Sequence, residues 1–138
     1  MIYIFLNIVP ILAATIASLA FGAALAAVVP SSGAGNRRSI GFIAIVFLAE
    51  FWLCSILAGA LILAPPEAGE WTMALGSAVV IWIGFVVPAL VVSLGYRNVS
   101  VGRTALHCAH WFGAMFIMAL VLKTIGLVPP PGAPGASG

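Results

Sequence analysis

Residues 40–64 read IGFIAIVFLAEFWLCSILAGALILA, and this stretch decides the fold class. Its only charged side chain is that of Glu50. A helix needs about 20 mainly apolar residues to cross the hydrocarbon core of a bilayer, and this stretch is long enough. The strands of an outer-membrane barrel would alternate apolar and polar residues, which this stretch does not do. It therefore predicts a transmembrane helix.

Three further stretches have the same apolar character, namely residues 2–29, 71–94 and 104–128. Hydrophobic residues make up 64% of the chain and charged residues 6%, whereas a soluble domain has about 25% charged residues. The sequence therefore predicts an all-α, polytopic membrane protein with four transmembrane helices.

The predicted helices form one domain, residues 1–128, because the chain is too short for a second. The last segment, residues 129–138, reads PPPGAPGASG. Repeated proline and glycine prevent a helix there, so we expect an extended or polyproline-like tail.

The basic residues of the connections predict the orientation. Arg37 and Arg38 lie in the first connection and Arg97 and Arg103 in the third, whereas the second contains no basic residue. Short cytoplasmic loops carry an excess of Lys and Arg. We therefore expect the first and third connections to face the cytoplasm, and both termini to lie on the other side of a bacterial inner membrane, cytoplasmic or intracytoplasmic.

Small residues recur at helical spacing in the first and fourth predicted helices. In lipid, helices associate by close backbone approach, so small residues mark their contact faces. The pattern predicts a packing face on each helix, formed by Ala14, Ser18, Gly22 and Ala26 in the first and by Ala105, Ala109 and Gly113 in the fourth.

Glu50 lies near the middle of the second predicted helix, where an ionised carboxylate is costly. We expect it to face protein or water, to have a partner, or to be protonated. By depth, Thr15 and Ser18 of the first helix reach its level, and His110 of the fourth lies about one turn away. Two hypotheses remain: a proton-responsive or cation-contacting group, and a protonated glutamate that stabilises helix packing through a hydrogen bond.

His107 and His110 are three residues apart and share one face of the fourth predicted helix. A haem held between two histidines usually takes them from different helices, and the chain has no other histidine. A haem or chlorophyll-type pigment bound through one of the two histidines remains open. The alternative is that both meet backbone, water or lipid headgroups.

No catalytic residue and no metal ligand is predicted. Cys54 and Cys108 lie within predicted helices and lack the spacing of a metal site. The sequence contains no phosphate-binding glycine loop and no nucleophile elbow. We therefore expect a protein that is not an enzyme, with bound lipid and no assigned cofactor.

Residues 81–122 read IWIGFVVPALVVSLGYRNVSVGRTALHCAHWFGAMFIMALVL, and this segment resembles the second half of small bacterial membrane proteins of the DUF1761 family. The matching positions are Trp82, Gly84, Phe85, His110, Trp111, Gly113 and Met118. The aromatic patch that usually ends the family's first helix is replaced here by small residues after Gly22. The resemblance implies four helices and about this length, and it implies no activity.

These features favour an accessory or structural subunit of a larger respiratory or photosynthetic inner-membrane complex. The expected partners are membrane lipids and other membrane subunits. Nucleic acid is not an expected partner, and the small net charge of +2 says little about it. The alternatives are a small oligomeric transporter or channel component that uses Glu50, and a pigment carrier that uses His107 or His110.

Overall fold

The computed structural model describes residues 2–28, 39–64 and 69–131. The elements are α1 (Ile2–Leu6), α2 (Ile8–Val28), α3 (Ile40–Ile62), α4 (Glu70–Ile81), the π-helical segment η2 (Trp82–Val86), α5 (Val87–Tyr96) and α6 (Val101–Ile125). Within the described residues there is no strand. Four helices are long and apolar enough to cross a membrane: α2, α3, the continuous run Glu70–Tyr96, and α6. The predicted all-α polytopic fold is therefore confirmed, whereas the side on which each terminus lies stays a prediction.

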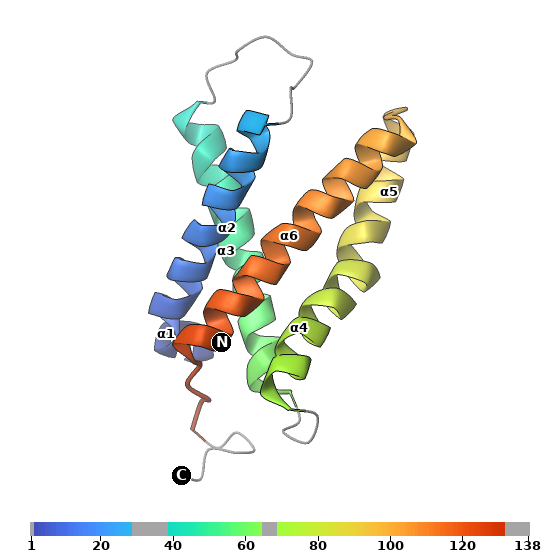
Figure 1. The fold of residues 1–138 in the computed structure, drawn as a ribbon. Coiled ribbons are helices and arrows are strands. Elements are labelled where there is room, and N and C mark those ends of the chain that lie inside the picture. The colour runs from blue at the N-terminus through green and yellow to red at the C-terminus, as the bar shows by residue number, and fades with distance from the viewer. Residues whose placement is uncertain (1, 29–38, 65–68, 132–138) are drawn as a thin grey trace.

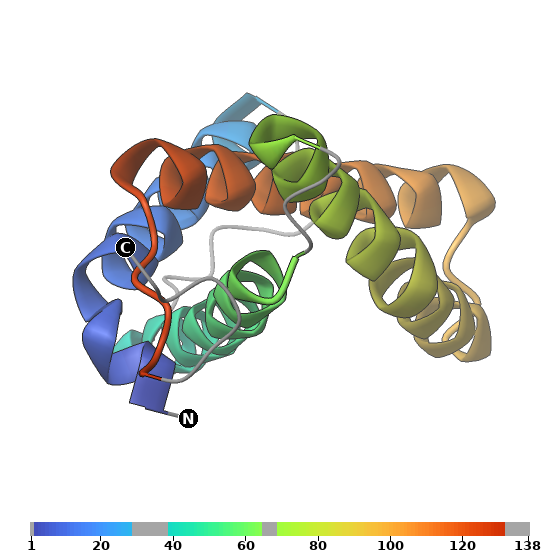
Figure 2. The ribbon, with the colours of Figure 1, turned by 90° about the horizontal axis from the view of Figure 1, so that it is seen from below.

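Helix α6 is central to the bundle, because it packs against α2, α3, α4, η2 and α5. Its most extensive contact is with α2. The α2–α3 pair lies close to α4 and α6 at one end of the molecule and diverges from α5 and α6 at the other (Figure 1, Figure 2). We call these the closed end and the open end. The beginning of α1 and the segment that follows α6 both lie at the closed end (Figure 1).

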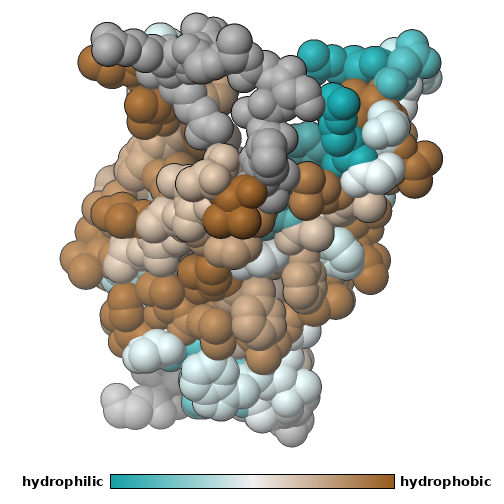
Figure 3. All heavy atoms as spheres, turned by 45° about the horizontal axis from the view of Figure 1, so that its top comes forward, coloured by the Kyte–Doolittle hydropathy of each residue, from teal (hydrophilic) through white to brown (hydrophobic). Residues whose placement is uncertain are grey.

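The surface has an apolar belt between two more polar ends (Figure 3). Large apolar side chains are exposed on all four spans, among them Ile16, Ile45, Phe85 and Phe112. A water-soluble protein rarely exposes so much contiguous apolar surface, whereas hydrocarbon is a good solvent for it. The described surface is therefore that of a protein surrounded by lipid.

Asn7 divides the first predicted span into α1 and α2 and links the two ends of the described chain. Its Nδ2 donates to the Val128 carbonyl oxygen at 2.9 Å and to the Tyr3 carbonyl oxygen at 2.8 Å, and its Oδ1 accepts from the Val128 N–H at 2.7 Å. The side chain is buried. These bonds hold the segment that follows α6 beside α1 (Figure 2).

The fourth span begins and ends about three residues earlier than the sequence pattern predicts. Gly126, with φ of 90°, ends α6, because this backbone conformation is open to glycine and costly for other residues. Pro129 and Pro130, which belong to the predicted tail, are partly buried, and residues 132–138 lie outside the described part.

The α5–α6 turn is a Schellman motif with asparagine in the left-handed position. Asn98 has φ of 54°, and its N–H donates to the Gly95 carbonyl oxygen at 3.0 Å. The Val99 N–H donates to the Leu94 carbonyl oxygen at 3.1 Å. Both bonds satisfy carbonyl groups at the helix end, so the chain reverses over very few residues and α5 and α6 are antiparallel neighbours.

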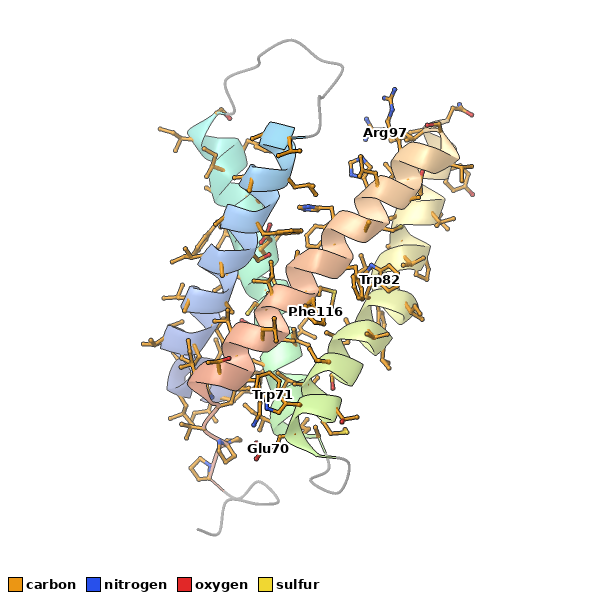
Figure 4. All side chains as sticks on the ribbon, viewed as in Figure 1. Glu70, Trp71, Trp82, Arg97 and Phe116 are labelled. Carbon is orange, nitrogen blue, oxygen red and sulfur yellow. The ribbon has the colours of Figure 1, made fainter. Side chains whose placement is uncertain are left out.

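The third span contains a π-helical turn directly before Pro88. Proline has no N–H to donate, and its ring crowds the carbonyl group four residues earlier, which is that of Gly84. The helix adjusts by an i→i+5 bond from the Val87 N–H to the Trp82 carbonyl oxygen. Trp82 also ties this region to α6, since its indole N–H donates to the Cys108 carbonyl oxygen at 2.8 Å (Figure 4).

At the closed end, Lys123 of α6 forms an ion pair with Glu70 at the start of α4. Figure 4 shows Glu70 and Trp71 at this end and Arg97 at the opposite end. Trp71 is exposed, where an interfacial tryptophan would meet lipid headgroups. An exposed pair of this kind adds little stability, and its main effect is to give Lys123 a partner near the membrane surface.

Replacing Asn7 with leucine is expected to release the segment around Val128, because leucine keeps the volume and removes all three hydrogen bonds of the amide. We expect a loss of about 1–3 kcal/mol in the free energy of unfolding. Thermal unfolding in detergent and hydrogen exchange at the Val128 amide measure the two effects. Asn98→Gly, in a turn at the other end, is the control, and unchanged exchange at Val128 in Asn7→Leu contradicts the role of Asn7.

Candidate functional site

Glu50 of α3 and Ser18 of α2 are buried next to each other in the interior of the bundle. Glu50 is 4% exposed and Ser18 is fully buried, and the Ser18 hydroxyl is the polar group beside the carboxyl. Within the described residues, neither Glu50 Oε2 nor Ser18 Oγ has a partner with hydrogen-bond geometry. The structure therefore places two unsatisfied polar atoms on facing helices, where water is scarce and each costs free energy.

Thr15 and Cys54 lie one turn from this pair, toward the closed end. The Thr15 hydroxyl donates to the Ile11 carbonyl oxygen of its own helix at 2.8 Å. The Cys54 thiol makes a longer contact of 3.6 Å with the same oxygen. Thr15 and Cys54 thus each have a backbone partner. Thr15 and Ser18 are the two α2 residues expected at the level of Glu50, and Ser18 is the one without such a partner beside the carboxyl.

His110 packs against α2 and makes no ion pair with Glu50. A Cβ atom added at Gly22 would lie 3.1 Å from His110 Cε1, so the imidazole occupies the space that the glycine leaves. The Phe21 ring stacks on the same imidazole, with 6.0 Å between ring centroids and 9° between planes. Because Ser18 and Gly22 are one turn apart, His110 and Glu50 contact adjacent turns of the same α2 face.

Exposure increases along α2 and α6 from the closed end to the open end. On α2, Ser18 is buried, Gly22 is half-buried and Ala26 is exposed. On α6, His110 is half-buried and His107 is exposed. The cause is the divergence of the two helices in Figure 1. Among the described residues, Glu50 and Ser18 are therefore the buried polar residues nearest the open end.

The small-residue pattern corresponds to helix contacts over only part of its length. Ala14 and Ser18 are buried, and Gly113 lies against Phe21, where an added Cβ would be 2.5 Å from Cζ of the ring. Three other members of the pattern, Ala26, Ala105 and Ala109, are exposed. Within the described residues, the expected packing face is thus too long at the open end, because α2 and α6 separate there.

The two histidines have different surroundings. His107 is exposed near the open end, whereas His110 is half-buried between Phe21 and Gly22 and also contacts Trp111 edge-on. The described residues contain no group of three or more His, Cys, Asp or Glu side chains that could hold a metal ion. Pigment binding by either histidine stays a prediction.

The arginines of the topology prediction are described in part. Arg97 and Arg103 are exposed at the open end, and the end of α2 and the beginning of α3 lie at the same end (Figure 1, Figure 4). Arg37 and Arg38 lie outside the described residues. The third connection and the two helix ends that flank the first are thus on one side of the molecule.

Sequence reasoning did not find the contacts of Asn7, Trp82 and Lys123. Asn7 gave a usable signal, since it is the only amide side chain in the first span. Its partner is a backbone amide near the other end of the described chain, which no local pattern identifies.

Comparison of the chain with protein-family models, with curated proteins and with solved structures finds no match in any of the three. The class of protein therefore follows from the structure alone. Four apolar spanning helices and an apolar belt define a multi-pass integral membrane protein in contact with lipid.

Substitution of Gly113 with alanine is expected to destabilise the α2–α6 contact by about 1–3 kcal/mol, because the new methyl group would overlap the Phe21 ring. Gly102→Ala is the matched control on the same helix, since its Cβ would meet no atom within 4 Å. Combining Gly113→Ala with Phe21→Ala should recover part of the loss. Thermal unfolding in detergent of the wild type, the single variants Gly113→Ala and Phe21→Ala, and the double variant measures this coupling, and additive losses contradict the contact.

Proposed function

We propose that this protein is a non-enzymatic subunit of a larger assembly in a bacterial inner membrane, where it acts by helix–helix association within the bilayer. A respiratory or photosynthetic complex is the kind of assembly meant. The observation that supports the proposal most is how little the third span packs within the chain. Of this span, only Ala74 and Ala78 are buried, and α5 contributes no buried residue.

A helix that packs so little against its own chain has most of its surface free for another membrane helix. Many of its exposed side chains are apolar, and helices in lipid associate by close van der Waals contact. The described α5–α6 turn is short, so this hairpin has little mass outside the lipid with which to do anything else. Both facts favour a role within the membrane plane.

The resemblance to the DUF1761 family fits this proposal in architecture and stays a prediction. The orientation with both arginine-bearing connections in the cytoplasm is part of the same proposal. The positive-inside rule supports it, as does the position of Arg97 and Arg103 at the end opposite to the Glu70–Lys123 pair.

A specific observation favours a second candidate, an ion- or proton-transporting component in an oligomer. It is the buried carboxyl of Glu50 without a partner among the described residues. Polar and ionisable side chains at this depth are expensive, and they usually mark ion pathways or proton relays.

Photo-crosslinking tests the assembly proposal at two positions with matched exposure. Val92 of α5 is 56% exposed and Ile16 of α2 is 59% exposed. A benzophenone amino acid placed at Val92 in native membranes is expected to crosslink another protein several-fold more than one at Ile16, because α5 buries none of its residues within its own chain. Intact-mass analysis after mild-detergent purification identifies the adduct.

Equal crosslinking at both positions, or lipid adducts alone at Val92, contradicts the assembly proposal. Migration of the detergent-extracted protein as a lone, stable monomer contradicts it as well.

A further inference from the structure

Glu50 and Ser18 need a third partner. Each carries a polar atom that is buried and unsatisfied among the described residues. The hydroxyls of Thr15 and Ser55 each donate to the carbonyl oxygen four residues earlier in their own helix, whereas the Ser18 hydroxyl makes no such bond. An ionised, unpaired carboxylate in mid-membrane would cost about 3 kcal/mol or more. The partner must therefore neutralise the carboxylate or bridge it to the hydroxyl.

The chemistry of the surroundings favours a proton over a metal cation. Hard cations such as Mg²⁺ and Ca²⁺ take about six to eight oxygen ligands. Here the side chains of Glu50, Ser18 and Thr15 offer two, one and one oxygens, four in all, which is fewer than such a cation takes. A proton needs only the carboxyl itself, and the protonated carboxyl becomes a donor for which the adjacent Ser18 hydroxyl is an acceptor.

The titratable groups around Glu50 point to the side from which a proton arrives. Helix α2 carries none, α1 offers only Tyr3, which lies against Gly59, and α4 offers only Glu70, which pairs with Lys123 at the closed end. On α6, His110 contacts α2 one helical turn from the level of Glu50, toward the open end. His107 lies farther in the same direction. On Glu50's own helix, Cys54 lies one turn toward the closed end.

Toward the closed end the interior is mostly apolar and tightly packed, and its buried polar side chains Asn7, Thr15 and Ser55 all have hydrogen-bond partners. The side chains of Ile11, Leu57, Met115, Met118 and Leu122 are all fully buried there. Toward the open end the side chains along α6 change from half-buried at His110 to exposed at His107. On α6, the two accessible histidines thus lie between the level of Glu50 and the open end.

We propose that Glu50, with Ser18 beside it, is a proton-binding site reached from the open end of the bundle through His110 and His107, and closed to the opposite membrane face. Water on the open side supplies the proton, the carboxylate becomes a neutral carboxyl that donates to Ser18, and release returns the proton to the same side. The inference deepens the transport candidate proposed above, and it holds whether or not the chain is also a subunit.

The first test measures protonation directly. The chain has three acidic residues, so Glu67→Gln with Glu70→Gln leaves Glu50 as the only acidic side chain. Dicyclohexylcarbodiimide modifies protonated carboxyls in apolar surroundings, and peptide mass analysis locates the adduct. We expect modification at Glu50 at about pH 5, falling at least tenfold by about pH 9 as the proton leaves.

Glu50→Gln in the same background is the control and should give no adduct. Because the adduct is mapped in the chain that retains Glu50, the test stands even if this control folds poorly. Absence of an adduct at every pH, or an adduct yield that does not change with pH, overturns the proposal and leaves Glu50 a structural residue.

The second test measures the side of access. In right-side-out and inverted membrane vesicles, the pH of the external buffer alone is changed before modification. We expect the adduct yield to follow external pH in one vesicle orientation only, the one that exposes the Arg97 end. Gly22→Leu, which crowds His110, should slow this response about tenfold, whereas Ala27→Leu at an exposed position of α2 should not.

A response in both orientations, or in neither, overturns one-sided access. Both tests measure proton binding and neither measures flux. A chain that binds a proton at Glu50 and transports none would therefore support the proton site and contradict the transport function.

Discussion

The close approach of α2 and α6 is the constraint on which the rest of the bundle depends. In lipid, burying an apolar side chain gains little, so these helices associate only where small residues let their backbones meet. Gly113 on α6 and Gly22 on α2 provide two such contacts near mid-membrane, against Phe21 and His110 of the other helix. Phe21 fills the space over Gly113, so the contact is tight at this level. Because α6 also packs against every element of the third span, its position on α2 sets that of the α4–α5 run.

The same contact determines where polar chemistry is tolerated. Between this contact and the closed end, the core is filled by large apolar side chains. The one buried amide among the described residues, that of Asn7, is hydrogen-bonded to Val128 and Tyr3. Between this contact and the open end, the helices separate and side chains become exposed. Glu50 lies at the boundary, buried enough for ionisation to be costly and near enough to the open end for exchange with water. A stable apolar interior on one side and an opening on the other are what a one-sided proton site requires.

The spans could be predicted from the sequence because lipid demands long apolar runs, and this demand is local in the chain. The depth of Glu50 and its proximity to Ser18 followed from counting residues along helices. The extent of the packing face could not be predicted, since Ala14 and Ala109 have similar local patterns and only the crossing of α2 and α6 makes one buried and the other exposed. The Asn7–Val128 hydrogen bonds could not be predicted either, because the partner of Asn7 is a backbone group distant in sequence.

The divergence of α2 and α6 is the central claim, and a pair of distances tests it most directly. Spin labels at Ala26 and Ala105 report the open end, and labels at Val9 and Ile125 report the closed end, in a background with Cys54 and Cys108 replaced by alanine; all four labelled positions are exposed. Pulsed electron paramagnetic resonance in lipid nanodiscs gives both distances. If α2 and α6 diverge as described, the mean distance is clearly longer at the open end. Equal distances, or a longer one at the closed end, would contradict this divergence.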